Sequence, residues 1–451
     1  MKIKNLILGT MFAGLAASAS AQTTDITITG ATAFRGAALQ AIYNAYATVG
    51  AAGTTFNVAH TSNGVAVANL TGSTRAIFSG SFPGITGTTV IRTSFSGSTE
   101  GLNAIAGNNN PTFLTAGALA GGNFTAGIKG AVTGNTETLR PKFSFSDVYQ
   151  STSPVDNMVL NPVGSSAVGI VTFAMIANEG APANLDSVTV QQCRTLWTNG
   201  IQRLSLFTGN TSDTTLVLAT GRNDGSGTRS AYLTEWGFGV ANLVNQYTHV
   251  NGGISSSGNG SISKLTLVPA NGIGSGAFST NRTTDNSTLW GNSAPGNGGY
   301  NSSSDLRTLM GYASSNVTIY DGQNESPVAE NEPVLLLTWL STTDCLSAAT
   351  AGAKILAYNG VKVTPMAVAD SYNSTGFNEA DFKKIISGAY SPWSYQHLYY
   401  HGSLNANETT WYNAMKSTYI PAGLQTTANG VRLGDMSVSR PDDGLPIVAP
   451  L

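Results

Sequence analysis

The sequence predicts an α/β fold in which strands and helices alternate along the chain. Runs with the alternating or wholly apolar pattern of strands are followed by polar loops and then by residues with helical apolar spacing. This order is typical of layered folds in which helices pack on a sheet. Ligands of such folds bind beyond the carboxyl ends of the strands, so the polar loops are where we expect a site.

The first expected unit consists of a strand at residues 25–29, a loop, and a helix at residues 36–46. The strand alternates apolar and polar residues, whereas the helix spaces its apolar residues by turns. The apolar run at residues 168–176 is continuous, which predicts a strand buried on both faces. The remaining expected strands cover residues 88–95, 140–147 and 264–268, and the remaining helices begin at residues 102 and 230.

The amino-terminal segment has the pattern of a secretory signal peptide. Lys2 and Lys4 precede the apolar run 6–17, and Ala19-Ser20-Ala21 supplies small residues for cleavage. Gln22 follows the expected cleavage point where a bacterial lipoprotein would have cysteine. We therefore expect residues 1–21 to be removed and the mature protein to be periplasmic or secreted.

Composition narrows the class of protein. Removing Lys2 and Lys4 from the 22 basic residues leaves 20 against 24 acidic ones, a net charge of about −4, so nucleic acid is not an expected partner. After the signal segment, no apolar run is long enough to span a membrane. With 41% hydrophobic and 10% charged residues, the chain can bury sizeable cores, and its 451 residues suggest two or three compact units.

Two further features leave alternatives open. Cys193 and Cys345 lie in the mature chain of an exported protein, where either a disulfide or two buried free thiols is compatible with the sequence. Residues 108–138 and 251–300 are rich in Gly, Ser and Asn and are expected to form long surface loops. His397 and His401 have helical i, i+4 spacing, but no glutamate follows His397 and no third ligand is evident, so no metal site is expected.

The segment Arg222-Asn-Asp-Gly-Ser-Gly-Thr228 has the chemistry of an oxyanion site. Its glycines allow the backbone to approach a ligand closely, and Ser226 and Thr228 supply hydroxyls. A helix that begins here directs free N–H groups and its positive dipole end at an anion. The Arg222 guanidinium can pair with phosphate or carboxylate through two parallel hydrogen bonds.

Four polar loops resemble, in the same order along the chain, those of the phosphate-binding proteins of bacterial ABC transporters. They are the opening loop Gly30–Phe34, the turn Gly97-Ser98-Thr99, the pair Ser146-Asp147, and the segment 222–228 with its Arg-x-Asp-Gly-Ser-Gly-Thr signature. The resemblance covers most of the mature chain and implies the type II periplasmic-binding-protein fold. It implies two α/β lobes, with lobe I at residues 22–168 and 338–451 and lobe II at residues 169–337.

The resemblance also implies a set of phosphate-binding residues. Asp147 can only accept hydrogen bonds as a carboxylate, so it favours an oxyanion that carries a proton and separates hydrogen phosphate from sulfate. Asp224 is expected to hold the Arg222 guanidinium in place without touching the ligand. Arg35 and Arg229 are further candidates for binding the same anion. The implied donors are the backbone N–H groups of Phe34 and Gly227, the hydroxyls of Thr32, Ser98, Ser226 and Thr228, and the guanidinium of Arg222.

The function implied is that of an exported solute-binding protein, without cofactor or catalytic residues, which passes inorganic phosphate to an ABC transporter permease. One alternative keeps the fold but makes the chain a surface or matrix protein that binds another anion or no small ligand. Ala33, where relatives carry a hydroxyl, and the Gly/Ser/Asn-rich loops favour this alternative. A second alternative is a weak phosphatase.

Overall fold

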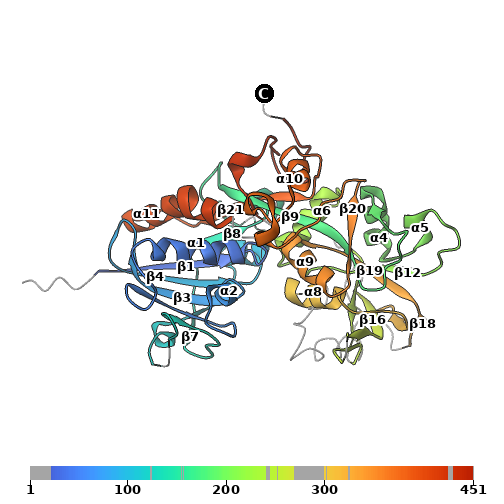
Figure 1. Ribbon diagram of the computed structural model, residues 1–451, viewed down its shortest axis with the longest axis horizontal. Helices are drawn as coiled ribbons and strands as arrows, with labels where there is room; N and C mark the ends of the chain where they lie inside the picture. Colours follow the sequence, from blue (N-terminus) through green and yellow to red (C-terminus); the bar gives the residue numbers. More distant parts are fainter. Residues whose placement is uncertain are drawn as a thin grey trace, which may run out of the picture.

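The protein has two lobes side by side, each built of strands and helices (Figure 1). The computed structural model describes residues 22–449 except 122–123, 154, 156, 240–243, 251, 258, 269–298, 301, 323–325 and 425–429. The signal peptide and much of the Gly/Ser/Asn-rich stretch 251–300 therefore lie outside the described residues. Within them, no helix is both long and apolar enough to cross a bilayer.

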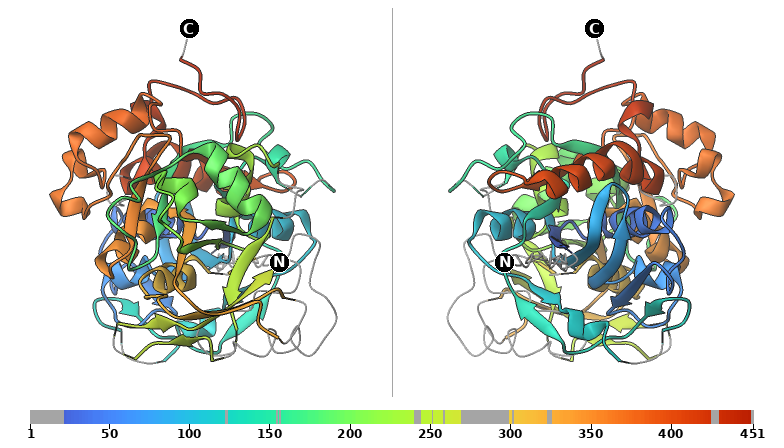
Figure 2. Two further views of the ribbon diagram at one scale, coloured as in Figure 1. Left: turned by 90° about the vertical axis from the view of Figure 1, so that its right-hand side faces the viewer. Right: turned by 90° about the vertical axis from the view of Figure 1, so that its left-hand side faces the viewer.

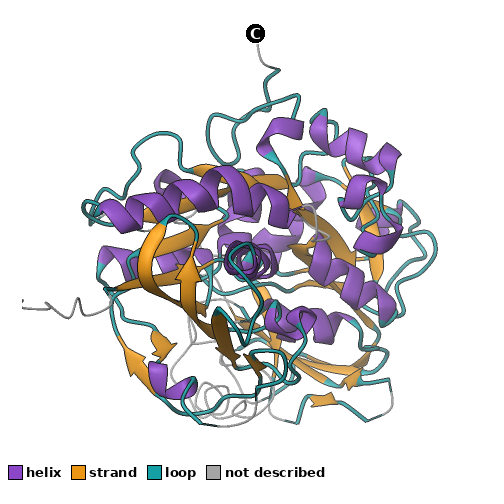
Figure 3. Cartoon of the chain, turned by 60° about the vertical axis from the view of Figure 1, so that its left-hand side comes forward, coloured by secondary structure: helices purple, strands orange, loops and turns teal. Residues whose placement is uncertain are grey.

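One large mixed sheet runs through both lobes. It contains 14 strands, with the main order β11-β12-β19-β9-β21-β8-β1-β4-β3-β2-β6. Figure 2 shows the molecule from the outer side of each lobe in turn, and Figure 3 shows helices packed beside the strands. The mixed sheet with its covering helices confirms the α/β class that the sequence predicts.

The first lobe is formed by the amino-terminal part of the described chain. Its central strand, β1, pairs in parallel with β4 on one side and with β8 on the other. Gly30 at the end of β1 lies opposite Phe95 of β4 and Phe145 of β8. Three strands therefore end at one edge of the sheet. The elements are β1 (Thr23–Gly30), α1 (Arg35–Ala47), β2 (Phe56–His60), α2 (Val67–Leu70), β3 (Arg75–Phe82), β4 (Ile85–Phe95), α3 (Ser98–Ala106), β5 (Thr112–Leu114), η1 (Ala116–Ala118), β6 (Ile128–Lys129), β7 (Thr136–Thr138), β8 (Phe143–Ser146) and η2 (Gln150–Thr152).

Strand β9 (Ala167–Ala177) connects the two lobes. Its first half pairs with β21 and its second half with β19 and β20, and its residues after Ala167 are all buried. This agrees with the sequence of the segment, which is apolar except for Thr172, because a strand covered on both faces needs no polar face.

The second lobe follows β9. Strand β12 pairs in parallel with β19. Both strands run toward the first lobe, and the loops at their carboxyl ends lie on that side. The elements are β10 (Ser187–Val188), α4 (Val190–Asn199), β11 (Ile201–Arg203), α5 (Ser205–Thr208), β12 (Leu216–Ala219), α6 (Gly227–Glu235), β13 (Gln246–His249), β14 (Ile254–Ser255), β15 (Ser261–Ile262), β16 (Lys264–Val268), α8 (Ser303–Met310), β17 (Val317–Tyr320), β18 (Ala329–Glu332), β19 (Val334–Ser341), α9 (Thr342–Thr350) and β20 (Lys354–Tyr358).

The carboxyl-terminal part returns across the sheet to the first lobe. Strand β21 lies between β9 and β8, and the helices after it pack against α1. Before that return, residues 342–358 pack with the core of the second lobe. The lobe limits that the resemblance implies, residues 22–168 with 338–451 and residues 169–337, stay a prediction. The elements are η3 (Val368–Asp370), η4 (Tyr372–Ser374), α10 (Glu379–Ile386), β21 (Trp393–Tyr400), α11 (Ala406–Ala414), the π-helical turn η5 (Met415–Tyr419), α12 (Ile420–Leu424), β22 (Gly430–Val431) and η6 (Leu433–Asp435).

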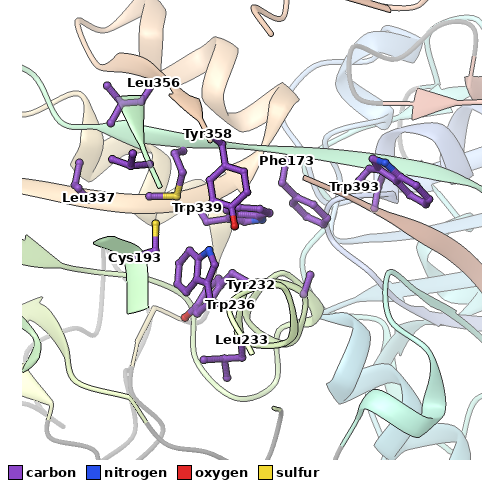
Figure 4. Close-up of a cluster of buried hydrophobic side chains, with 14 of the residues drawn as sticks. Phe173, Cys193, Tyr232, Leu233, Trp236, Leu337, Trp339, Leu356, Tyr358 and Trp393 are labelled. Atoms are coloured by element: carbon purple, nitrogen blue, oxygen red, sulfur yellow. The ribbon is translucent and has the colours of Figure 1, made fainter. Parts of the chain in front are cut away.

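An aromatic cluster forms the core of the second lobe next to the first lobe (Figure 4). Trp236 lies at its centre, with ring centroids 4.5 Å from Trp197, 4.8 Å from Tyr232 and 5.8 Å from Trp339. Such large buried rings contribute strongly to the stability of a core. The cluster packs around the last turn of α6 and so fixes the position of that helix.

Several expectations from the sequence can be compared with these elements. The strand at residues 264–268 is confirmed as β16, and the helix at residues 36–46 is confirmed within α1. His397 does not lie on a helix: it is a buried residue of β21, and the spacing to His401 is a coincidence of strand sequence. Cys193 and Cys345 are both buried free thiols, which settles the alternative that the sequence left open.

Candidate functional site

Helix α6 presents its amino terminus to the first lobe. Ser226 caps the helix by accepting a hydrogen bond from the Arg229 backbone N–H at 3.4 Å. The other end is held by Tyr232 and Trp236 in the aromatic cluster. Because both ends are fixed, Gly227 and Thr228 in the first turn are held at the boundary between the lobes, where both are buried.

Arg222 is fully buried beneath this turn. Its Nε donates to the Tyr300 carbonyl oxygen at 3.1 Å. The backbone carbonyl of Arg222 accepts from Arg229 Nη1 at 3.2 Å and from Gln246 Nε2 at 3.3 Å. Gln246 is held in turn, since its Oε1 accepts from Tyr232 and Trp197 at 2.6 and 3.0 Å. The position of the guanidinium is therefore set by a buried hydrogen-bond network.

Three carboxylates act through their charge on the pKa of Arg222. Burial lowers the pKa of Arg222, and the negative charges of Asp344, Asp147 and Asp305 raise it again. Burial raises the pKa of Asp305 to about 6, while Arg222 and Arg307 oppose that rise. Asp147 comes from the first lobe and the others from the second, so Arg222 couples the two lobes electrostatically.

Asp147 and Ser98 form a buried pair at the sheet edge of the first lobe. Asp147 follows β8 and is 1% exposed, and Ser98 begins α3. The Ser98 hydroxyl donates to the Asp147 carboxylate and accepts from the Asp147 backbone N–H at 3.2 Å. Burial raises the pKa of Asp147 to about 6, although the Ser98 hydrogen bond and the Arg222 charge lower it.

The two lobes touch at this pair. A Cβ atom built on Gly227 would lie 1.6 Å from Asp147 Oδ1 and 2.5 Å from Ser98 Oγ, so only glycine fits here. Beside it, the Glu100 backbone N–H donates to the Gly225 carbonyl at 3.1 Å. An anion can enter between Ser98 and Gly227 only when the lobes separate, as hinge-linked lobes do around ligands.

The opening loop of the chain lies beside this contact. Phe34 precedes the first turn of α1, and its buried ring packs on Phe145 with centroids 5.2 Å apart. Thr32 is half-buried and lines an interlobe cavity of about 460 Å³. The structure thus brings Ser98, Asp147 and Gly227 into direct contact, with Thr32 on the wall of a neighbouring cavity.

Asp224 has a different charge partner from the one expected. The sequence predicts that it supports Arg222, but the cation that lowers its pKa, against the rise caused by burial, is Arg229. The carboxylates that act on Arg222 are those of Asp147, Asp305 and Asp344. Arg222 of the motif and Arg229, which directly follows it, therefore interact with different carboxylates.

Residues that sequence reasoning missed surround Arg222 in the second lobe. Gln246 and Tyr300 lie 24 and 78 residues from it in sequence, and no pattern links them to the motif. The position of Asp344 could have been predicted from the sequence, because Ser341 and Asp344 have the spacing of an amino-terminal helix cap. In the structure Ser341 caps α9 and accepts from the Asp344 N–H at 3.3 Å. Among the described residues no group of three His, Cys, Asp or Glu side chains is placed to hold a metal.

Solved structures similar to this chain include transport proteins. A phosphate ABC transporter substrate-binding protein from Clostridium perfringens, described as putative and with bound phosphate, is 12% identical with a TM-score of 0.41, over 91% of this chain and all of that one. An ABC-type phosphate transport receptor from Vibrio cholerae is 11% identical with a TM-score of 0.42, over 90% and 99%. PstS from Borrelia burgdorferi is 9% identical with a TM-score of 0.35, over 91% and 98%.

These structures belong to the class that the sequence motifs resemble, and their match extends along nearly the whole chain. No protein-family model and no curated protein sequence matches the chain. The identities and TM-scores are low, so the likeness carries no inference about the ligand. The assignment of the site therefore rests on the geometry around Asp147 and Arg222.

The pKa of Asp147 predicts a pH dependence of stability. Its value rises from 3.8 to about 6 on folding, so between these values the folded protein binds more protons than the unfolded chain. The free energy of unfolding is therefore expected to fall as the pH rises from about 4 to about 6, and to stay lower above that range. Urea unfolding across this range, with wild type and Asp147→Asn compared, measures the effect.

The comparison isolates Asp147 because other buried carboxylates are present in both proteins. Burial also raises the pKa of Asp305 to about 6 and of Asp443 to about 7, and their contributions cancel in the difference. Asp147→Asn is expected to flatten the slope and to be the more stable protein above pH 7 without ligand. Equal slopes would contradict the shifted pKa of Asp147.

Proposed function

We propose that the protein is an exported solute-binding protein that captures inorganic phosphate between its lobes and delivers it to an ABC transporter permease. Ser98 and Asp147 come from the first lobe, and Arg222 and Gly227 from the second. An anion held by both sets stabilises the closed arrangement, which is how a binding protein signals its loaded state.

The observation that carries the proposal is the buried Asp147 carboxylate beside a buried arginine. Above pH 6 the carboxylate is ionised and can only accept a hydrogen bond. An oxyanion that keeps a proton, such as hydrogen phosphate, can donate to it, whereas fully ionised sulfate is repelled. A site built only to bind any anion would gain nothing from a buried carboxylate at this place.

The other groups provide the donors that a dehydrated dianion requires, because an uncompensated buried charge is very costly. Arg222 supplies the charge, and the first turn of α6 supplies backbone N–H groups with the positive end of the helix dipole. The proposed binding groups are the backbone N–H groups of Phe34 and Gly227, the hydroxyls of Thr32, Ser98, Ser226 and Thr228, and the Arg222 guanidinium.

Isothermal titration of the mature protein with phosphate and with sulfate tests the proposal. We expect phosphate to release or absorb heat on binding and to bind wild type more tightly than sulfate does. In Asp147→Asn the ratio of the two affinities should fall by at least about tenfold, because the amide can donate a hydrogen bond to sulfate. Asp370→Asn changes an exposed aspartate of η3 and is the matched control. Absence of binding to phosphate in wild type would reject phosphate as the ligand.

A pH series adds an independent check on the role of Asp147. Below the pKa of about 6 the carboxyl group is neutral and can donate a hydrogen bond to a fully ionised oxygen. Sulfate binding by wild type is therefore expected to strengthen as the pH falls from 7.5 to 5. Sulfate binding that stays constant over this range, while Asp147→Asn behaves alike, would remove Asp147 from the proposed selectivity.

A second candidate function is that of a surface or matrix protein with the same architecture but no small ligand. The direct contact of Gly227 with Asp147 and Ser98 favours it, because the contact leaves no room for an anion between these groups as they stand. The same titration separates the two functions. A stably folded wild-type protein that gives no heat with phosphate or sulfate supports this second candidate.

A further inference from the structure

A separate cavity lies between the lobes on the side of α1, α2, α8 and α9, which face one another across the middle of Figure 1. Its volume is about 460 Å³, within the range of sites for small organic ligands. Ser98, Asp147 and Gly227 are not among the residues that line it. Its lining combines both lobes and includes Thr32, Arg35, Ser303, Arg307, Thr343 and Asp344.

Arg35 is the most unusual group in this cavity. It occupies the first turn of α1, and its Nε is buried without a hydrogen-bond partner among the described residues. Burial lowers the pKa of Arg35, Asp344 raises it, and the nearby Arg307 lowers it further. A buried donor without an acceptor is costly, so this guanidinium is poised to receive one.

The opposite wall belongs to the second lobe. Arg307 of α8 donates to the Asp344 carboxylate at 3.2 Å, and Asp344 also accepts from the Ser341 hydroxyl at 2.9 Å. The hydroxyl oxygen of Thr343, which also lines the cavity, is buried without a partner in the described part of the chain. Arg35 therefore brings a charged side chain without an ion-pair partner, among the described residues, to the cavity, whereas the Thr343 hydroxyl is enclosed within the wall.

Charge decides which ligand the cavity suits. Its charged lining groups are Arg35, Arg307 and Asp344, which leave one positive charge. Behind the wall, Asp305 lies near both Arg222 and Arg307 and does not line the cavity. A guanidinium pairs well with a carboxylate in a bidentate arrangement. An anion placed between Arg35 and Arg307 also relieves the repulsion that lowers the pKa of Arg35.

We propose that this cavity binds a small organic molecule with one carboxylate group and a hydroxylated body. The carboxylate pairs with Arg35, and the body lies against the hydroxyl-bearing residues Thr32, Ser303 and Thr343. The cavity lies beside the phosphate contact: Thr32 borders both, but Ser98, Asp147 and Gly227 do not line the cavity. Its occupation would hold α1 of the first lobe against α8 and α9 of the second.

The test is calorimetric titration with D-gluconate, L-lactate and benzoate, with sorbitol as the neutral counterpart of gluconate. We expect gluconate to bind and sorbitol not to bind. Arg35→Gln is expected to weaken gluconate binding by at least about tenfold, because a hydrogen-bonded charge pair is lost. Arg203→Gln changes an exposed arginine of β11 and should leave binding unchanged.

A second variant, Ser303→Ala, removes a hydroxyl from the cavity lining and keeps the proposal testable if Arg35→Gln does not fold. It is expected to weaken gluconate binding as well. Failure of all three carboxylates to bind would overturn the proposal, and so would gluconate affinity that is equal in wild type, Arg35→Gln and Ser303→Ala. Phosphate titration of the same proteins distinguishes this proposal from the proposed function. If gluconate binds and phosphate does not, the carboxylate site in this cavity is supported and only phosphate as the ligand of the other site is rejected.

Discussion

Replacing Arg222 by alanine is expected to lower the free energy of unfolding by about 1–3 kcal/mol, the cost of leaving a buried hydrogen-bond acceptor, here the Tyr300 carbonyl, without its donor. The Arg222 side chain is 1% exposed, and the carboxylates of Asp147, Asp305 and Asp344 all act on it. Without the guanidinium these buried carboxylates lose their compensating charge. The same variant is expected to lose phosphate binding.

Urea unfolding at pH 7.5 measures the stability, and phosphate titration measures binding under conditions where the variant is folded. Arg203→Ala removes an exposed arginine and is expected to change the free energy of unfolding by less than about 0.5 kcal/mol. The loss in Arg222→Ala should shrink at pH 5, because Asp147 and Asp305, whose pKa values are about 6, become neutral there. An equal loss at both pH values would contradict the electrostatic explanation.

Gly227→Ala is expected to push the lobes apart. The added methyl group would lie 1.6 Å from Asp147 Oδ1 and 2.5 Å from Ser98, and both of these belong to the first lobe. Overpacking of this kind typically costs about 1–3 kcal/mol when neighbours can move. Since hinge motion relieves the clash without unfolding either lobe, we expect an opened molecule that still folds and that binds phosphate at least about tenfold more weakly.

Small-angle X-ray scattering of the variant detects the opening as a larger radius of gyration than that of wild type. Gly434→Ala is the matched control, because a Cβ at Gly434 meets no atom within 4 Å. The control should scatter as wild type does. A Gly227→Ala protein with the radius of gyration of Gly434→Ala would show that the clash is absorbed within the loops and that the lobes do not separate there.

Much of the fold was predictable because local patterns are strong in this chain. The alternation at residues 25–29 belongs to β1, and the apolar run at residues 168–176 is β9, buried almost throughout. The β-strand character of His397 was not predicted, since the tyrosine-rich sequence around it fits helical spacing equally well. Its pairing with β8 and β9 is a long-range contact that sequence periodicity does not contain.

The candidate site was predictable in part. Strands β4 and β8 pair in parallel with the two sides of β1 and end at the same edge of the sheet, and so Ser98 and Asp147, which follow them, are in contact. The support of Arg222 by Asp224 stays a prediction. Burial lowers the pKa of Arg222, and the carboxylates of Asp344, Asp147 and Asp305, which are distant in sequence, raise it. Proximity in sequence is a weak guide to charge pairing inside a fold.

The cavity at Arg35 was beyond the reach of sequence. Its walls come from α1 and α2 in one lobe and from α8 and α9 in the other, and its shape depends on how the lobes face each other. Arg35 itself was a candidate for the same anion as Arg222. In the structure it faces Arg307 and Asp344 instead, which makes it the centre of a second site.

A crystal structure of the mature protein grown with saturating phosphate tests the central claim most directly. The predicted result is tetrahedral density between the lobes, within hydrogen-bond distance of the Asp147 carboxylate, the Gly227 backbone N–H and the Arg222 guanidinium, with Ser98 and Gly227 moved apart to admit it. Density only between Arg35 and Arg307, or Gly227 still in contact with Asp147 and no bound anion, would contradict the claim.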